Sequence, residues 1–306
     1  MNSLRLATRG SDLARTQSGA FAAALLSATG RSSELVIVRT QGDRVQDVAL
    51  AEAGATGLFT AEVQKAVLDR RADYAVHSLK DLPAEQVAGL RLGAIPSRED
   101  GRDVLLVRPE AHEPGREPLP LKPGAQVGTS AARRGAFLRA LDPQARPALL
   151  RGNVPTRVGR LAAGDYDAIL LAAAGLNRLG ADLSAFVVVR LPYEVWPGAP
   201  GQGALAVECR ADDDTTFALL RRLHDPTAAR EVEAERALLR ALGGGCGLPL
   251  GARAETLPDG RLRLHAAFGP TPDRPAAPPL ARTRVEGDDP VELAAAARDR
   301  LLAGGD

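Results

Sequence analysis

Long apolar runs are absent from this sequence, and cysteine and lysine are scarce. No stretch reaches the roughly 20 apolar residues of a membrane-spanning helix, and no apolar signal core follows Met1, so we expect a cytoplasmic protein without membrane contact. The two cysteines, Cys209 and Cys246, lie far apart without a CxxC motif, which argues against a disulfide framework and a cysteine zinc site. The four histidines are scattered singly, so no metal is expected.

The charge is nearly balanced, because 39 basic residues stand against 38 acidic ones and the formal net charge is +1. A nucleic-acid-binding surface needs a surplus of cations, so no nucleic-acid partner is expected. Only three of the basic residues are lysines, namely Lys65, Lys80 and Lys122, and the others are arginines.

With 306 residues, 45% of them hydrophobic, the chain is long enough for two or three domains with separate cores.

Strand and helix patterns alternate through the first two-thirds of the chain. Predicted strands cover residues 4–7, 34–38, 74–77, 91–95, 103–107, 126–128, 148–150 and 167–173. Predicted helices cover residues 11–29, 60–71, 131–141 and 155–163. This alternation is typical of open parallel α/β sheets, which bind ligands at the carboxyl ends of their strands.

Other segments depart from that alternation. Residues 108–124 carry five prolines and are predicted to form a surface loop, whereas the turn at Gly201 leads into one more strand. From Thr227, which we expect to cap a helix, the pattern changes to that of a small α+β domain. Its predicted elements are a helix to residue 242, strands at 250–254, 261–267 and 281–285, and a last helix that Asp289-Pro290 opens and Gly304 ends.

Two predicted strand-to-helix turns combine hydroxyl groups, free backbone N–H groups and arginines. They are Gly128-Thr-Ser-Ala-Ala-Arg-Arg134 and Leu150-Arg-Gly-Asn-Val-Pro-Thr-Arg157, and Ala7-Thr-Arg-Gly-Ser11 is a third turn of this kind. Such turns favour anions, and the arginine fork suits carboxylates. Any one of them alone would fit solvated surface charges, but three together favour a polyanionic small molecule as the ligand.

Two further segments contain candidate reactive side chains. The apolar strand that begins at Asp73 ends in a polar tip with Lys80 and Asp81, where a carboxylate could stabilise a developing cation or form only a loop salt bridge. His77 is expected to point into a packed layer. Cys246 is flanked only by glycines, so it is a candidate nucleophile or attachment point, with an ordinary free loop thiol as the alternative.

Taken together, these motifs resemble the porphobilinogen deaminase family, also called hydroxymethylbilane synthases. The resemblance runs from Leu4 to about Ala254 and continues more loosely into the last helix. Its markers are Ala-Thr-Arg-Gly-Ser (7–11), Gly-Leu-Phe-Thr (57–60), Ala-Val-His-Ser-Leu-Lys-Asp-Leu-Pro (75–83), Gly-Thr-Ser (128–130) with Arg133-Arg134, Leu-Arg-Gly-Asn-Val (150–154) with Thr156-Arg157, Ala-Ala-Gly-Leu-Asn-Arg-Leu-Gly (173–180), Gly-Gln-Gly-Ala (201–204) and Gly-Gly-Cys (244–246).

The resemblance implies a fold class and a reaction. The fold is α/β, with two domains like those of type II periplasmic binding proteins, a cleft between them and a small α+β C-terminal domain. The implied divisions are residues 1–98 with 200–222, residues 99–199, and residues 223–306. The implied activity adds four porphobilinogen units in turn, each with loss of ammonia, to a dipyrromethane cofactor and then releases hydroxymethylbilane by hydrolysis. The protein is expected to act as a monomer in tetrapyrrole and haem biosynthesis.

The resemblance also assigns site residues. Catalytic roles fall on Asp81, Lys80 and Arg9, and the covalent thioether to the cofactor falls on Cys246. The other implied cofactor-binding residues are Ser11, Lys80, Asp81, Thr129, Ser130, Arg133, Arg134, Arg151, Gly152 and Gln202. The implied substrate-binding residues are Arg9, Phe59, Arg157 and Arg178.

Three positions depart from the common family pattern, namely Ala131 in place of a serine, Thr56 in place of a lysine and Gly247 in place of a bulkier residue. None of them touches Cys246 or Asp81, so activity is expected. The alternative is a non-catalytic organic-anion sensor of periplasmic-binding-protein type. It would explain the arginine turns but not the glycine-flanked cysteine or the Lys80-Asp81 tip.

Overall fold

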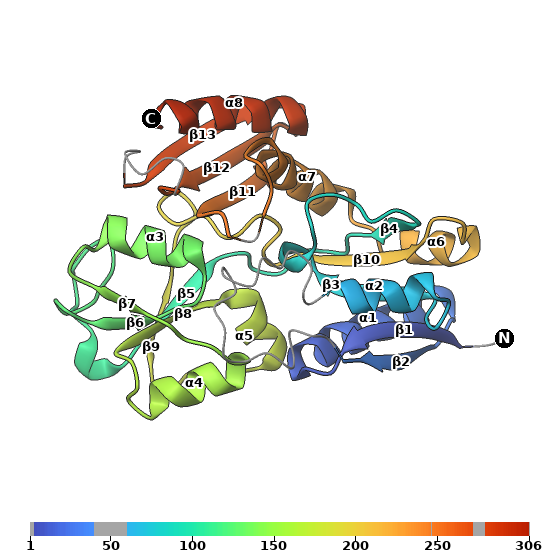
Figure 1. Ribbon diagram of the computed structural model, residues 1–306, viewed down its shortest axis with the longest axis horizontal. Helices are drawn as coiled ribbons and strands as arrows, with labels where there is room; N and C mark the ends of the chain where they lie inside the picture. Colours follow the sequence, from blue (N-terminus) through green and yellow to red (C-terminus); the bar gives the residue numbers. More distant parts are fainter. Residues whose placement is uncertain (1–2, 40–59, 246, 272–278, 306) are drawn as a thin grey trace.

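The chain folds into three units, each built on its own β-sheet (Figure 1). The computed structural model describes residues 3–39, 60–245, 247–271 and 279–305. Across these described ranges, no helix combines the length and the apolar character that crossing a membrane requires.

The first unit holds a five-stranded sheet in the order β2-β1-β3-β10-β4. Its strands are β1 (Leu4–Arg9), β2 (Ser33–Val38), β3 (Tyr74–Ser78), β4 (Leu90–Ala94) and β10 (Leu205–Arg210). Its helices are α1 (Asp12–Thr29) and α6 (Asp214–Arg221) on one face and α2 (Ala61–Leu68) on the other. Leu6 packs toward α1 and its neighbour Ala7 toward α2, because successive strand residues point to opposite faces.

The second unit repeats this design with the order β7-β6-β8-β5-β9. Its strands are β5 (Asp103–Val107), β6 (Gln126–Gly128), β7 (Arg146–Ala148), β8 (Ala168–Ala172) and β9 (Val187–Arg190). Its helices are α3 (Ala132–Leu141) on one face and α4 (Val154–Ala162) and α5 (Ala173–Leu179) on the other. All five residues of β5 are buried, since helices cover both faces of the sheet.

The two sheets share one topology, and each receives its fourth strand from a distant part of the chain. In the first sheet β10 runs antiparallel between β3 and β4, and in the second β5 runs antiparallel between β8 and β9. The chain therefore crosses between the units twice, from β4 to β5 and from β9 to β10. Two similar α/β units are confirmed, and each sheet holds an antiparallel strand that the alternation of strands and helices did not reveal.

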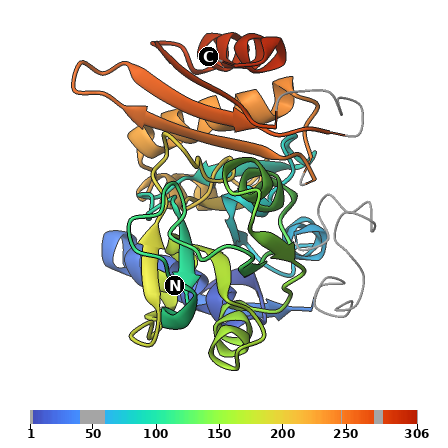
Figure 2. The ribbon, with the colours of Figure 1, turned by 90° about the vertical axis from the view of Figure 1, so that its left-hand side faces the viewer.

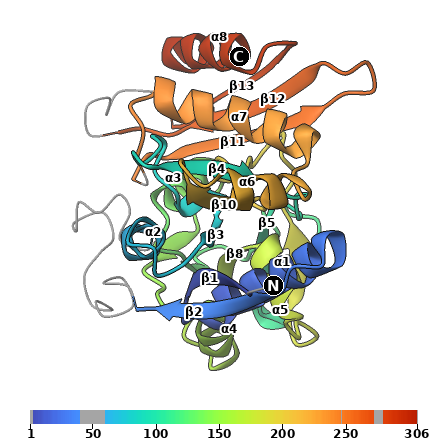
Figure 3. The same ribbon diagram turned by 90° about the vertical axis from the view of Figure 1, so that its right-hand side faces the viewer.

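The third unit is a three-stranded antiparallel sheet covered by two helices. It consists of β11 (Leu250–Thr256), β12 (Leu262–Phe268), β13 (Ala281–Gly287), α7 (Pro226–Ala241) and α8 (Pro290–Ala303). Figures 2 and 3 show α8 on the outer side of this sheet, away from the other two units. The expected small α+β domain at the C-terminal end is thus confirmed.

Helix α7 joins the third unit to both crossings between the other two. The carboxylate of Glu235 is completely buried and accepts hydrogen bonds from Arg98 Nη1 at 2.6 Å and from the backbone N–H of Gly201 at 2.7 Å. Arg98 lies on the first crossing and Gly201 on the second. One buried carboxylate therefore holds both connecting segments at the place where the three units meet.

Several local predictions need correction. Asp225, and not Thr227, caps α7, because Pro226 occupies the first helical position and fixes the start two residues earlier. The strand β7 lies two residues before its predicted place. Elements α5, β9 and α6 were not predicted at all. The proline-rich stretch 108–124 is not only surface loop, since its Leu119 and Leu121 are buried in the core of the second unit.

Candidate active site

A polar cavity of about 80 Å³ lies at the carboxyl ends of β1 and β3. Arg9, the last residue of β1, lines it together with Ser11, Ser78 and Asp81. Ser11 caps α1, and its Oγ accepts a hydrogen bond from Ala14 N at 3.4 Å. The sequence-based expectation that these side chains meet at a strand edge is met for Arg9, Ser11 and Asp81.

Lys80 and Asp81 lie on a short 3₁₀ helix, η2 (Leu79–Asp81), directly after β3. Lys80 Nζ donates a hydrogen bond to Gln202 Oε1 at 3.3 Å. Burial lowers the pKa of Lys80 to about 8, although the charge of Asp81 opposes this shift. Among the described residues no ion pair joins Lys80 to Asp81, so the loop salt bridge is not what the structure shows, and the Asp81 carboxylate faces the cavity.

His77 lies on β3, three residues before Lys80, and is buried, as expected from its strand position. Its Nε2 is 3.1 Å from Glu208 Oε2, and the same oxygen accepts a hydrogen bond from Gln64 Nε2 at 2.9 Å. Burial alone would raise the pKa of Glu208, but the hydrogen bond and charge of His77 outweigh it and leave that pKa below its ordinary value. This buried pair ties β3 to β10 beneath Asp81.

Across from Lys80, the buried carboxylate of Asp103 holds the arginine pair of α3. Asp103 Oδ2 is 2.8 Å from Arg133 Nη2, and Asp103 Oδ1 is 2.7 Å from Arg134 Nη2. Gln202 Nε2 donates to Asp103 Oδ1 at 2.8 Å, and Trp196 Nε1 donates to Oδ2 at the same distance. Gln202 therefore connects Lys80 on the first unit to the arginine pair on the second.

Asp103 was not among the predicted site residues. It was assigned only to the start of a strand, although a carboxylate at the head of an otherwise apolar run is a signal that could have found it. Its partners lie 30 to 99 positions away in the sequence, which no local pattern reveals.

We expect Asp103→Asn to lower the free energy of unfolding by about 3–5 kcal/mol at pH 7, because two buried guanidiniums lose their counter-ion. The arginines hold the pKa of Asp103 well below its ordinary value of 3.8, despite burial. A depressed folded-state pKa contributes stability above the unfolded value and loses it as the pH falls. The difference between wild type and variant, measured by urea unfolding, should therefore shrink below about pH 4.

The matched control is Asp214→Asn, since Asp214 pairs with Arg91 on the surface and its side chain is 92% exposed. A surface pair contributes about 1 kcal/mol or less. Equal losses for the two variants would contradict the buried role of Asp103.

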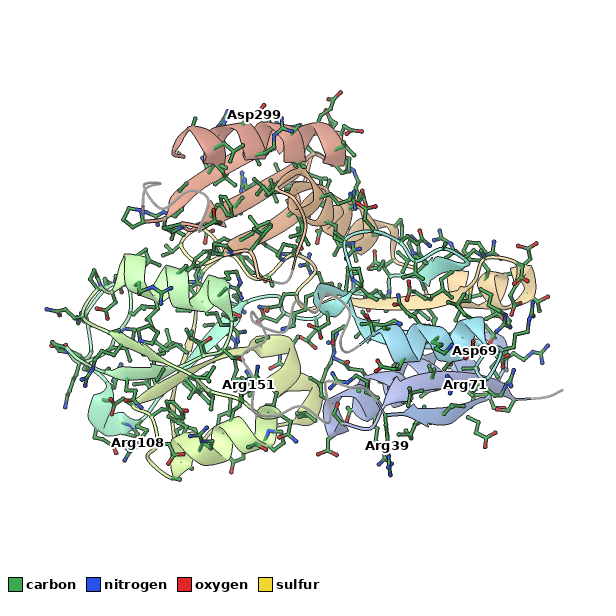
Figure 4. All side chains as sticks on the ribbon, viewed as in Figure 1. Arg39, Asp69, Arg71, Arg108, Arg151 and Asp299 are labelled. Carbon is green, nitrogen blue, oxygen red and sulfur yellow. The ribbon has the colours of Figure 1, made fainter. Side chains whose placement is uncertain are left out.

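Further arginines gather around the turn before α4. Arg157 Nε donates to the carbonyl of Gly152 at 2.7 Å, and Asn153 caps the helix through a hydrogen bond from Thr156 N. Burial and the charges of Arg134 and Arg151 lower the pKa of Arg157 to about 10. Figure 4 shows Arg151 toward the middle of the molecule, whereas Arg108 and Asp299 lie at its periphery. Arg134, Arg151 and Arg157 thus form a cluster of mutually repelling cations.

The remaining predicted residues lie near these two groups. Thr129, at the end of β6, accepts a hydrogen bond from Ala131 N at 3.3 Å, and Ser130 follows it half-buried. Arg178 on α5 donates to the Gly203 carbonyl at 2.7 Å, next to Gln202. Gly152 has φ of +110°, a conformation that favours glycine. Phe59 and Cys246 lie outside the described residues.

Comparisons with known proteins identify the family. The model described as porphobilinogen deaminase, dipyromethane cofactor binding domain, matches residues 4–218, and the model of the C-terminal domain matches residues 229–303. The porphobilinogen deaminase of Brevibacillus brevis is 41% identical over 308 residues, which cover 100% of this chain and 96% of that protein. That of Syntrophobacter fumaroxidans is 47% identical over 262 residues, covering 85% and 82%. The chain belongs to the porphobilinogen deaminase family.

As a member of that family, the chain is a transferase of porphyrin biosynthesis with a dipyrromethane cofactor, and the identification made from the sequence motifs is confirmed. The sensor alternative is not favoured.

Among solved structures, a periplasmic substrate-binding protein of Coxiella burnetii has a TM-score of 0.44 at 15% identity, covering 79% of this chain and 99% of that chain. A Salmonella typhimurium periplasmic binding protein with high arginine specificity has a TM-score of 0.41 at 11% identity, covering 75% and 94%.

Proposed function

We propose that Asp81 is the catalytic carboxylate of this porphobilinogen deaminase and that Cys246 carries the dipyrromethane through a thioether. In the proposed reaction, four porphobilinogen units are condensed in turn with loss of ammonia, and hydrolysis then releases hydroxymethylbilane. The observation that carries this proposal is the position of Asp81, which has no ion pair among the described residues, in a polar cavity. The adjacent Lys80 is linked through Gln202 and Asp103 to Arg133 and Arg134.

The charge of Asp81 suits the chemistry of the reaction. When porphobilinogen loses ammonia, the substrate is left as a methylene-pyrrolenine cation. A fixed carboxylate lowers the energy of such a developing charge, more so where water is excluded. Since no ion pair among the described residues involves Asp81, its charge is available for this purpose. Lys80 and Arg9 would assist by orienting the acetate and propionate groups near the reacting carbon.

The cation cluster fits a ligand with many carboxylates. Each pyrrole unit carries an acetate and a propionate, so a bound dipyrromethane would bring four negative charges. Burial, and after it the charges of Arg134 and Arg151, lowers the pKa of Arg157, so the guanidiniums of this cluster repel one another. A bound polycarboxylate would relieve this repulsion and form bidentate pairs with the guanidiniums.

The proposed binding residues divide into two groups. Those for the cofactor are Ser11, Lys80, Asp81, Thr129, Ser130, Arg133, Arg134, Arg151, Gly152 and Gln202. Those for the incoming substrate are Arg9, Phe59, Arg157 and Arg178. When bound, the cofactor supplies the terminal pyrrole to which new units are added. We propose that the protein is a cytoplasmic monomer. Its domain boundaries are proposed to lie between residues 98 and 99, between 199 and 200, and between 222 and 223.

The experiment that tests the proposal is the intact mass of the purified protein. We expect a mass above that of the sequence by two porphobilinogens less two ammonias, because each thioether or carbon–carbon bond forms as one ammonia leaves. Added porphobilinogen should produce a ladder of further increments, each one porphobilinogen less one ammonia. Digestion should place the increment on the peptide that contains Gly244-Gly-Cys-Gly247.

The second cysteine provides an internal control. Cys209 is completely buried in the core of the first unit, so its peptide should be unmodified. An unmodified protein with full activity would overturn the covalent attachment, and an unmodified protein inert toward porphobilinogen would favour the sensor alternative.

A further inference from the structure

Helix α7 reaches two parts of the proposed site at once. Its C-terminal end runs into the turn Gly243–Gly245, which leads to Cys246 in the sequence. About two helical turns earlier, Arg236 points toward the segment that follows Asp81. The same rigid helix therefore precedes the proposed attachment residue and touches the loop of the proposed catalytic carboxylate.

Arg236 binds three consecutive carbonyl groups of that segment. Its Nη2 donates to the carbonyl of Pro83 at 2.6 Å and to that of Ala84 at 3.1 Å. Its Nη1 donates to the carbonyl of Leu82 at 3.5 Å. Leu82 is the residue directly after Asp81, so the guanidinium fixes the backbone immediately behind the carboxylate.

Arg236 is half-buried, and its guanidinium is held by carbonyl groups. No ion pair among the described residues includes Arg236. Burial and the charge of Arg240 both disfavour its charged form and lower its pKa. Carbonyl dipoles, and no directly paired carboxylate, thus compensate the cation. If only packing were required, an apolar side chain would avoid the desolvation penalty. A planar fork with five donors is suited to holding several carbonyls in one fixed arrangement.

The glycine turn is tied to the same helix and rests on the same segment. Gly243 N donates to the carbonyl of Arg240 at 3.0 Å, and Gly244 N donates to that of Leu239 at 2.9 Å. A Cβ placed on Gly244 would lie 3.6 Å from the Cβ of Ala84. The turn that precedes Cys246 and the loop that follows Asp81 therefore lie side by side, with Arg236 bonded to one and carried by the helix of the other.

We propose that Arg236 is a positioning residue, which sets the Asp81 carboxylate relative to a cofactor attached at Cys246. The inference rests on the proposed function of those two residues. Removal of the fork keeps both reactive groups in the chain but frees the segment 82–84, and with it the Asp81 carboxylate, to shift. The consequence is a loss of turnover with little change in substrate affinity.

The test compares Arg236→Leu with Arg230→Leu. Arg230 lies on the same helix and also donates to two carbonyls, those of Gly260 and Asp288, but both belong to the third unit. We expect kcat per cofactor-bearing molecule to fall roughly 10- to 100-fold for the Arg236 variant, the scale of a misplacement near 1 Å. KM should stay within about threefold, and the Arg230 variant should keep the wild-type kcat within about twofold.

Conservative variants separate positioning from packing. Arg236→Lys keeps donors for the carbonyls and should retain more kcat than Arg236→Met, which only fills the space. Equal kcat for these two variants, or a kcat of Arg236→Leu within twofold of Arg230→Leu, would overturn the inference. If Arg236→Leu does not fold, Arg236→Gln against Arg230→Gln decides by the same criterion.

The wild-type protein keeps the two hypotheses distinguishable. A wild type without the mass increment or without turnover overturns the proposed function. A wild type with both, together with unaffected Arg236 variants, overturns only the positioning role.

Discussion

Cys246→Ala protein is expected to lack the dipyrromethane mass increment and to show no turnover of porphobilinogen. The physical reason is that alanine has no sulfur to form the carbon–sulfur bond, so the growing chain has no covalent anchor. The glycines around the cysteine leave room for a bulky adduct, and Gly243 and Gly244 both have positive φ. Intact mass and porphobilinogen consumption measure the two losses on the same sample.

Cys209→Ala is the matched control for this result. Cys209 is buried between α1, α6 and the first sheet, so its replacement should reduce the free energy of unfolding by about 1 kcal/mol and leave the increment and the turnover intact. Turnover of the Cys246 variant at a measurable rate would show that the primer is held without that thiol.

Local sequence patterns predicted most elements but not their arrangement. Strand β5 and helix α8 follow from an apolar run and from a capped, proline-opened helix start, and both are properties of a few adjacent residues. The insertion of β5 and β10 as antiparallel fourth strands is different, since it pairs β10 with a strand about 130 residues earlier. No periodicity encodes such a partner, and this is why the local patterns did not reveal the antiparallel strands.

The residues of the candidate site likewise divide into those that local patterns reveal and those that depend on distant partners. Asp81, Lys80 and the arginine turns could be predicted because each lies at a strand end within a short polar motif. Arg236 could not, because its role depends on partners brought together by the fold, and Asp103 was missed although its carboxylate opens an otherwise apolar run. Arg236 meets carbonyl groups more than 150 residues away, and carbonyl groups leave no mark in a sequence.

Asp103 also bears on how the proposed catalytic carboxylate, Asp81, stays without an ion pair to any described residue near so many cations. Arg133 and Arg134 lie close enough to Lys80, the neighbour of Asp81, for their charges to act on it. Because Asp103 binds both guanidiniums in the buried layer, it compensates one unit of their charge. The neutral side chain of Gln202 donates a hydrogen bond to Asp103 and accepts one from Lys80, so it joins the two without adding charge. The cluster stays cationic enough for carboxylates without capturing Asp81.

Asp81→Asn should reduce turnover by roughly 10²-fold or more, the scale expected when one preorganised electrostatic group is lost. Asparagine keeps the size and the hydrogen-bonding capacity of the side chain but removes the charge that stabilises the substrate cation. The fold should survive, because no ion pair of the described residues depends on Asp81, and the cofactor increment can persist. Porphobilinogen consumption by matched amounts of folded protein, checked by circular dichroism, measures the effect.

Asp81→Glu separates charge from position. Its charge is retained, so it should be less harmful than asparagine, but the added methylene displaces the carboxylate, and a displacement near 1 Å can itself cost on the order of 10²-fold. Asp69→Asn, at an exposed carboxylate paired with Lys65, should keep the wild-type rate. A wild-type rate for Asp81→Asn would remove Asp81 from the chemistry. The catalytic carboxylate would then have to be sought at Asp43, which lies outside the described residues, since the cavity at the ends of β1 and β3 is lined by no other carboxylate of the described chain.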